Sequence, residues 1–133
     1  PNGWTQGTTS DEPGVQFQNQ TIPQEYAAFK TPNNVTPNTT ATDLANTDLQ
    51  NNFDKQPGYM PPSSQSTATI GGENWVTETA SYQPPNGQKI QVEVFATIHQ
   101  SKAYIIELQA AEGQFASEND KYFQVMLSRF QFE

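Results

Sequence analysis

The clearest evidence for the fold is the sequence IQVEVFATIHQSKAYIIELQAA from Ile90 to Ala111, which lies inside a well-patterned segment, residues 73–133. Apolar residues occupy every second position from Ile90 to Ile98, with mostly polar residues between them. This period of two is typical of a strand with one buried face. The alternation resumes after residues 100–102, so we predict two antiparallel strands joined as a hairpin.

The register of this hairpin follows from the alternation. The second apolar set consists of Tyr104, Ile106, Leu108 and Ala110. If both apolar sets lie on one face of the sheet, the connection must contain an odd number of residues, because a slip of one residue would turn one set to solvent. We therefore predict a turn of three or five residues between the two strands.

Two capping boxes predict the helices. Ser117 stands three residues before Asp120, and Thr40 stands three residues before Asp43. In a capping box the two side chains hydrogen-bond free backbone N–H groups of the first helical turn. Apolar residues follow each box at helical spacing. They are Leu44, Ala45, Leu49 and Phe53 in the first case, and Tyr122, Phe123, Met126, Leu127 and Phe130 in the second.

The remaining alternating segments supply further strands. We predict them near residues 4–9, 15–18, 25–31, 63–70 and 75–82, with a short terminal strand at Phe130-Gln131-Phe132. No segment repeats at a fixed period and no linker divides the chain. Residues 1–133 are therefore expected to form a single α+β domain, in which an antiparallel sheet of about six to eight strands packs against two main helices.

Composition excludes several classes of function. The chain has no cysteine, which excludes disulfides, thiolate metal sites and a cysteine nucleophile. Only 15% of its residues are charged, and its net charge is −8. This charge repels phosphate backbones and anionic lipid head groups, so we expect no nucleic-acid partner. No apolar run approaches the ~20 residues of a membrane span, so we expect no direct membrane insertion.

The same composition bears on location. Lysine is scarce, whereas Asn, Gln, Thr and Ser are abundant, and the first residue is Pro1 rather than Met. We interpret the chain as a monomeric portion of a longer bacterial protein that is secreted or tethered to the cell surface. The alternative is a cytoplasmic domain with unusual residue usage.

The order of these features resembles the PsbP-like family. This family is named for an extrinsic subunit of photosystem II, and its relatives include a Ran-binding import protein and bacterial lipoproteins. The resemblance spans nearly the whole chain and implies a PsbP-like sandwich that serves as a binding or accessory subunit. No motif here carries over a metal site from the photosynthetic members. The resembling residues are Gly3-Trp4, Val15 to Phe17, Thr42-Asp43-Leu44, Gly71 to Trp75, Lys102 to Ile106, Tyr122-Phe123 and Leu127 to Phe130.

No grouping of residues predicts a reaction. His99 is the only histidine, and the nearby Ser101 and Glu107 lack the glycine-framed turn of a nucleophile elbow. The alternating acidic spacing of a calcium loop is also absent. The acidic residues are expected at a turn, at helix caps or at exposed strand positions, which are Asp11, Glu12, Asp43, Asp120, Glu73, Glu78 and Glu93. We therefore predict no catalytic residue, no metal and no cofactor.

Aromatic side chains are the candidates for recognition, because amphipathic rings anchor interfaces and sugar sites. The loop Tyr59-Met60-Pro61-Pro62 is the best of them, since no strand or helix period demands its burial. The candidate binding residues are Tyr59, Met60, Trp75 and Tyr82.

These observations favour a non-catalytic binding or accessory module with an unidentified protein or small-molecule partner. Two alternatives are a small hydrolase that uses carboxylates in a cleft between sheet and helix, and a sensor domain that binds a small molecule or a glycan through its aromatic residues.

Overall fold

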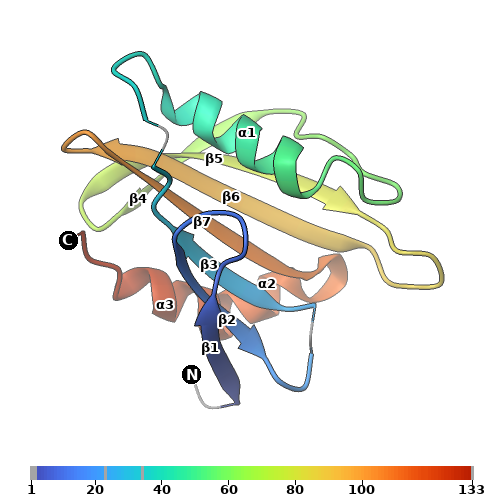
Figure 1. The fold of residues 1–133 in the computed structure, drawn as a ribbon. Helices are drawn as coiled ribbons and strands as arrows, with labels where there is room; N and C mark the ends of the chain where they lie inside the picture. Colours follow the sequence, from blue (N-terminus) through green and yellow to red (C-terminus); the bar gives the residue numbers. More distant parts are fainter. Residues whose placement is uncertain (1–2, 23, 34, 133) are drawn as a thin grey trace.

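The structure is a computed structural model that describes residues 3–22, 24–33 and 35–132. Within these residues, seven antiparallel strands form one twisted sheet in the order β1-β2-β3-β7-β6-β5-β4 (Figure 1). The predicted α+β architecture is confirmed. The strands are β1 (Trp4–Thr8), β2 (Gly14–Asn19), β3 (Tyr26–Lys30), β4 (Gln65–Ile70), β5 (Glu73–Tyr82), β6 (Ile90–His99) and β7 (Lys102–Ala111).

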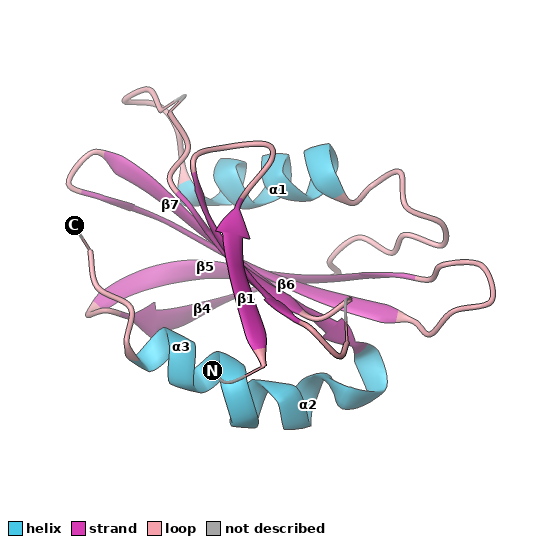
Figure 2. Cartoon of the chain, turned by 60° about the horizontal axis from the view of Figure 1, so that its bottom comes forward, coloured by secondary structure: helices cyan, strands magenta, loops and turns pink. Residues whose placement is uncertain are grey.

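Helices cover both faces of the sheet. Helix α1 (Ala41–Asn52) lies on one face, and the C-terminal helical segment lies on the other (Figure 2). This segment begins with a 3₁₀ turn (Glu112–Gln114) and continues through α2 (Phe115–Glu118), a π-helical turn (Asn119–Phe123) and α3 (Gln124–Ser128). None of the described helices has the length and apolar character needed to cross a membrane.

The central hairpin has a tighter turn than its alternation suggests. His99 pairs with Lys102, so only Gln100 and Ser101 connect β6 to β7. Both connecting residues have positive φ angles, 50° and 64°, as a type I′ turn requires. The predicted turn of three or five residues is therefore wrong.

The short turn places the two apolar sets of the hairpin on opposite faces. Val94 lies opposite Glu107, and Phe95 lies opposite Ile106. Each strand buries both parities because each face of the sheet has its own helical cover, which also explains why Phe95 interrupts the polar positions of β6. The core beneath α1 contains Leu44, Ala45, Leu49, Phe53, Ala80, Val92, Val94, Ala96, Ala103 and Ile105. The core of the other face contains Ala27, Ile70, Trp75, Phe95, Tyr104, Ile106, Leu108, Ala110, Phe115, Phe123 and Leu127.

One of the two predicted capping boxes forms. The Asp43 amide donates to Thr40 Oγ1 at 3.1 Å, and the Thr40 amide donates to Asp43 Oδ2 at 3.3 Å. The box predicted at Ser117 and Asp120 is wrong. The chain is already helical at Phe115, and Ser117 Oγ donates to the Gln114 carbonyl instead. A serine inside a helix meets no free amide, so it cannot cap.

The predicted terminal strand is also absent. Phe130 and Phe132 follow α3 in irregular structure. Their ring centroids lie 5.3 Å and 5.9 Å from that of Trp75. The alternation of Phe-Gln-Phe therefore reflects two aromatic anchors on the core and not a strand.

Candidate functional site

Three carboxylic acids surround the ammonium group of Lys30. Lys30 Nζ lies 2.6 Å from Glu107 Oε2, 2.7 Å from Asp11 Oδ2 and 3.0 Å from Asp48 Oδ1. Lys30 is 4% exposed, Glu107 is 3% exposed and Asp48 is 1% exposed. We call these four residues the Lys30 cluster. A buried lysine is rare unless it is paired, and here each of its three donors has a carboxylate acceptor.

Four separate elements position this cluster. Lys30 ends β3, Glu107 lies in the adjacent β7, Asp48 lies on α1, and Asp11 belongs to the connection between β1 and β2. In the register of β3 and β7, Lys30 is opposite Ile105 and Ala28 is opposite Glu107, so both charged side chains are on the face beneath α1. Asp48 falls on the buried stripe of α1 beside Leu49.

The cluster holds a proton at neutral pH. Burial raises the pKa of Asp48 to about 9, and the hydrogen bond and charge of Glu107 act in the same direction against the effect of Lys30. Asp48 Oδ2 is buried and accepts no hydrogen bond from the described residues, so it is free to carry the proton of Asp48. The Tyr26 hydroxyl donates to the other Glu107 oxygen at 3.2 Å.

The opposite charges of Lys30 and Asp11 stabilise each other. Burial alone would lower the pKa of Lys30, but the charges of Asp48 and Glu107 raise it well above its ordinary value. Burial tends to raise the pKa of Asp11, yet the hydrogen bond and charge of Lys30 outweigh this effect and lower it. Lys30 is thus a permanent cation and Asp11 a permanent anion at neutral pH.

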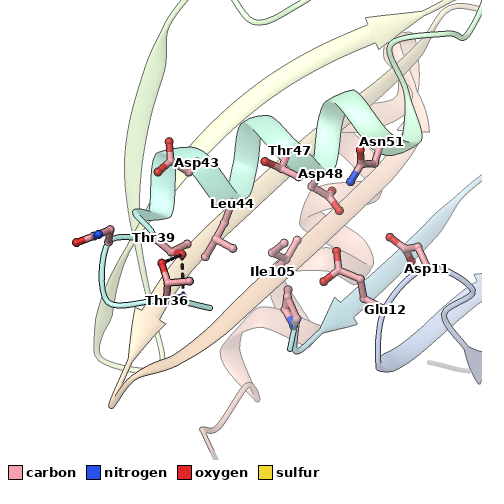
Figure 3. Close-up of a pocket in the computed structure, with 12 residues that line it drawn as sticks. Asp11, Glu12, Thr36, Thr39, Asp43, Leu44, Thr47, Asp48, Asn51 and Ile105 are labelled. Carbon is pink, nitrogen blue, oxygen red and sulfur yellow. Dashed lines mark hydrogen bonds between the residues drawn. The ribbon is translucent and has the colours of Figure 1, made fainter. Parts of the chain in front are cut away.

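A cleft of about 520 Å³ opens beside the cluster, between α1, the segment around Thr36 and the turn that carries Asp11. Figure 3 shows Asp48 pointing from α1 toward the side chains of Glu12 and Asp11. Among the described residues that line it, none is Lys, Arg or His. The lining consists of four acids (Asp11, Glu12, Asp43, Asp48), neutral polar residues (Thr36, Asn38, Thr39, Thr47, Asn51), and Pro32, Leu44 and Ile105.

Glu12 is the acid in this cleft that lacks a partner. Its side chain is half-buried, and within the described residues its carboxylate makes no hydrogen bond and no ion pair. Burial raises the pKa of Glu12, and the charge of Asp11 adds to this effect, while Lys30 opposes it. A half-buried carboxylate that forms no ion pair favours the approach of a positive charge.

A second, smaller cavity of about 270 Å³ lies on the other side of Lys30 and Asp11. Its lining includes Tyr26, Tyr82 and Gln109. The Tyr82 hydroxyl donates to Gln109 Oε1 at 3.2 Å. Asp11 lines both cavities.

The four predicted binding residues do not gather at one place. Trp75 is fully buried in the core opposite α1, and its indole N–H donates to the Ile70 carbonyl. Tyr59 and Tyr82 pack against the core beneath α1. Met60 is 55% exposed and pairs with Ser81 through an isolated β-bridge. Tyr59 and Met60 thus remain candidates for contact with a partner, whereas Trp75 offers no exposed surface.

The expectation of an exposed position is wrong for one of the strand acids. Glu78, predicted at an exposed strand position, is 7% exposed. Asp48 and Glu107 were not predicted as site residues, although each leaves a signal in the sequence. Asp48 interrupts the apolar stripe of α1, and Glu107 interrupts the apolar parity of Ala103 and Ile105.

Ser101, His99 and Glu107 do not come together as a catalytic triad. His99 Nδ1 lies 3.0 Å from Glu73 Oε2, and its ring stacks on Phe132 with centroids 4.0 Å apart. Glu107 is bound to Lys30. The one histidine of the chain is therefore a packing and pairing residue at the end of β6.

The cluster has the spacing of a cation site, but its cation is Lys30. Ligand oxygens of Asp11, Asp48 and Glu107 lie within 4.8 Å of one another. A divalent ion at their centre would meet the ammonium group, which is at most 3.0 Å from each acid. The residues present do not fit a metal while Lys30 holds this position.

Comparison with known proteins identifies the fold. No family model and no curated protein matches the sequence. Among solved structures, the chain is similar to the cyanobacterial PsbP protein CyanoP from Synechocystis, with 19% identity, a TM-score of 0.65, and coverage of 96% of this chain and 81% of that one.

Two further structures share the architecture. LpqN, which is involved in cell envelope biogenesis of Mycobacterium tuberculosis, has 16% identity and a TM-score of 0.57, with 98% of this chain and 78% of that chain covered. A Pseudomonas aeruginosa protein of unknown function, described as a putative regulator, has 11% identity and a TM-score of 0.59, with 100% and 89% covered. The predicted PsbP-like fold is confirmed.

Proposed function

We propose that this chain, which has the PsbP-like fold, is a non-catalytic binding module that acts outside the cytoplasm and holds a positively charged group of its partner in the acidic cleft. The observation that carries the proposal is the half-buried Glu12 carboxylate, which faces a cleft without a basic side chain among the described lining residues. The ligand would supply the missing cation.

Electrostatics supports this assignment both at long range and within the cleft. The net charge of −8 attracts cationic partners from afar and raises their association rate. Within the cleft, a cation about 4 Å from Glu12 would gain up to about 4 kcal/mol at an effective dielectric constant near 20, before the cost of its desolvation. The neutral Thr and Asn residues around the acids offer hydrogen bonds without adding charge.

The hydrolase alternative has one observation in its favour, because carboxylic acids do line a cleft between α1 and the sheet. Asp48 and Glu107 would be its acid and base. Their side chains, however, are 0% and 4% exposed, and both are hydrogen-bonded to Lys30. General acid–base catalysis needs a group within hydrogen-bond reach of the substrate, and buried carboxyls that are bound to a lysine favour a structural role.

The similar structures give indirect support for an accessory role. CyanoP is a PsbP protein of a cyanobacterium, and LpqN takes part in cell envelope biogenesis. A function outside the cytoplasm is consistent with the neutral-polar, lysine-poor composition of this chain. Tyr59 and Met60 are candidate contacts for a protein partner outside the cleft.

The test is a binding measurement with a short lysine-rich peptide and a matched peptide of neutral residues. We expect the lysine peptide alone to bind, with an affinity that falls as salt is added. Glu12→Gln is expected to weaken binding about fivefold, a loss of about 1 kcal/mol. Glu112→Gln, which removes an exposed acid on the 3₁₀ turn, is the control.

Equal binding of both peptides, or an unchanged affinity in Glu12→Gln, would remove the cleft as the site. Hydrolysis of a substrate by the unaltered protein that is lost in both Asp48→Asn and Glu107→Gln would establish the enzyme alternative.

A further inference from the structure

A second pair of acids lies outside the cleft, where the C-terminal helical segment meets the sheet. Glu25 precedes β3 and is 1% exposed, and Glu118 ends α2. Glu25 Oε1 and Glu118 Oε2 are both buried and have no hydrogen-bond donor in the described chain. The two carboxyls are hydrogen-bonded to each other, which requires a proton between them, because an unsatisfied buried carboxylate is costly.

We infer that Glu25 and Glu118 share one proton and form a pH-dependent latch, which ties the C-terminal helical segment (residues 115–128) to the strand end at Glu25. The two side chains are within hydrogen-bonding reach of each other. The latch is independent of the acidic cleft and of the function proposed for it.

The groups around Glu25 set the pH range of the latch. Burial, followed by the hydrogen bond and charge of Glu118, raises the pKa of Glu25 to about 7. Two groups act in the opposite direction. Asn19 Nδ2 donates to Glu25 Oε2 at 3.2 Å, and Lys121 on the π-helical turn contributes its charge. Lys121 is exposed and lies 5.3 Å from the Tyr122 ring centroid, so it compensates a second negative charge only weakly.

The segment that the latch holds is a good candidate for local opening. The helix runs without a break from Phe115 to Ser128, and no side chain caps its start at Gln114. An isolated helix of this length is only marginally stable in water, so its stability comes mainly from tertiary contacts. Here those contacts are the buried Phe115, Phe123 and Leu127 and the carboxyl pair. Loss of the shared proton places two negative charges at the joint and favours opening.

The direction of the pH dependence follows from the shifted pKa. The closed segment keeps a proton that the open segment releases, so rising pH favours the open form between the ordinary pKa of glutamate, 4.5, and the raised value near 7. Within that window the opening equilibrium is expected to change by up to about tenfold per pH unit, and above it the dependence levels off.

The first experiment is a titration of the unaltered protein followed by the carboxyl ¹³C resonances of its glutamates. The proposal expects Glu25 to titrate near pH 7. Titration of Glu25 near pH 4.5 would overturn it.

The second experiment measures amide hydrogen exchange of residues 115–128 between pH 5 and pH 8, with the intrinsic exchange rate divided out. Protection in the unaltered protein is expected to fall more than tenfold as the pH rises to about 7. In Glu25→Gln the amide donates to Glu118 in place of the shared proton, so protection should be independent of pH. Glu118→Gln should behave in the same way.

Asp120→Asn, an exposed acid of the same segment, is the matched control and should keep the pH dependence of the unaltered protein. If Glu25→Gln keeps it as well, the latch does not exist. Should either glutamine variant fail to fold, the ¹³C titration still decides.

Discussion

At the scale of single residues, Lys30 is the side chain on which the site depends. It satisfies three buried or half-buried acids at once. Removing one partner of a buried ion pair typically costs about 3–5 kcal/mol, because the remaining charges lose their compensation. Lys30→Met is therefore expected to lower the free energy of unfolding by about this amount, as measured by urea denaturation. Lys89→Met, which breaks an exposed pair with Glu112, should cost less than about 1 kcal/mol.

The same substitution tests the geometry of the cluster. When the ammonium group of Lys30 is removed, the three acids keep the spacing of a cation site. Calcium is expected to raise the urea midpoint of Lys30→Met and to leave that of the unaltered protein unchanged, because binding to the folded state alone stabilises it. Equal calcium responses of the two proteins would show that Lys30 does not occupy the cation position.

The sequence pattern marks the members of this cluster as unusual, but it does not show that they contact one another. Lys30, Asp48 and Glu107 each stand at a position where the local period demands an apolar residue. A polar residue on a buried face needs a partner. Lys30 is 18 residues from Asp48 and 77 residues from Glu107, so the partner is identified only when the strand order is known.

At the scale of elements, the two capping boxes provide a matched comparison. Thr40 hydrogen-bonds the Asp43 amide at the start of α1, whereas Ser117 lies inside a helix that has already begun. Thr40→Ala should therefore destabilise the protein by about 1 kcal/mol, and Ser117→Ala should cost a few tenths of this. The measurement is again the free energy of unfolding in urea. Equal losses in the two variants would contradict the assignment of the helix starts.

The sequence alone predicts where the strands lie, but it does not predict which of their faces are buried. Alternation identified β5, β6 and β7 because a period of two is a property of the strand alone. Which parity is buried depends on what covers each face, and both faces are covered here. The I′ turn at Gln100-Ser101 was missed because neither residue is the Gly or Asn that usually marks positive φ.

At the scale of the whole molecule, the raised pKa values of Glu25 and Asp48, about 7 and about 9, predict greater stability at mildly acidic pH. The folded state binds more protons than the unfolded state above the ordinary pKa of each group, so the free energy of unfolding should fall as the pH rises from about 5 to about 9. The lowered pKa of Asp11 acts only below about pH 4, where protonation removes its contribution. Lys30 keeps its charge throughout this range.

Unfolding free energies measured in urea at several pH values check this prediction. The double variant Glu25→Gln, Asp48→Asn should show a flatter profile than the unaltered protein. A profile that rises steadily from pH 5 to pH 9 would contradict both assignments.

The pairing of β3 with β7 also has a consequence for how the chain reaches its native state. The four strands β4 to β7 are neighbours in sequence and in the sheet, whereas β3 meets β7 only after α1, β4, β5 and β6 have intervened in the chain. A contact between segments so far apart in sequence is entropically costly to form and slows folding. During synthesis β1, β2 and β3 must wait for nearly the whole chain before they join the sheet. Until that moment Lys30 lacks Glu107, so the ion cluster can assemble only at a late step of folding.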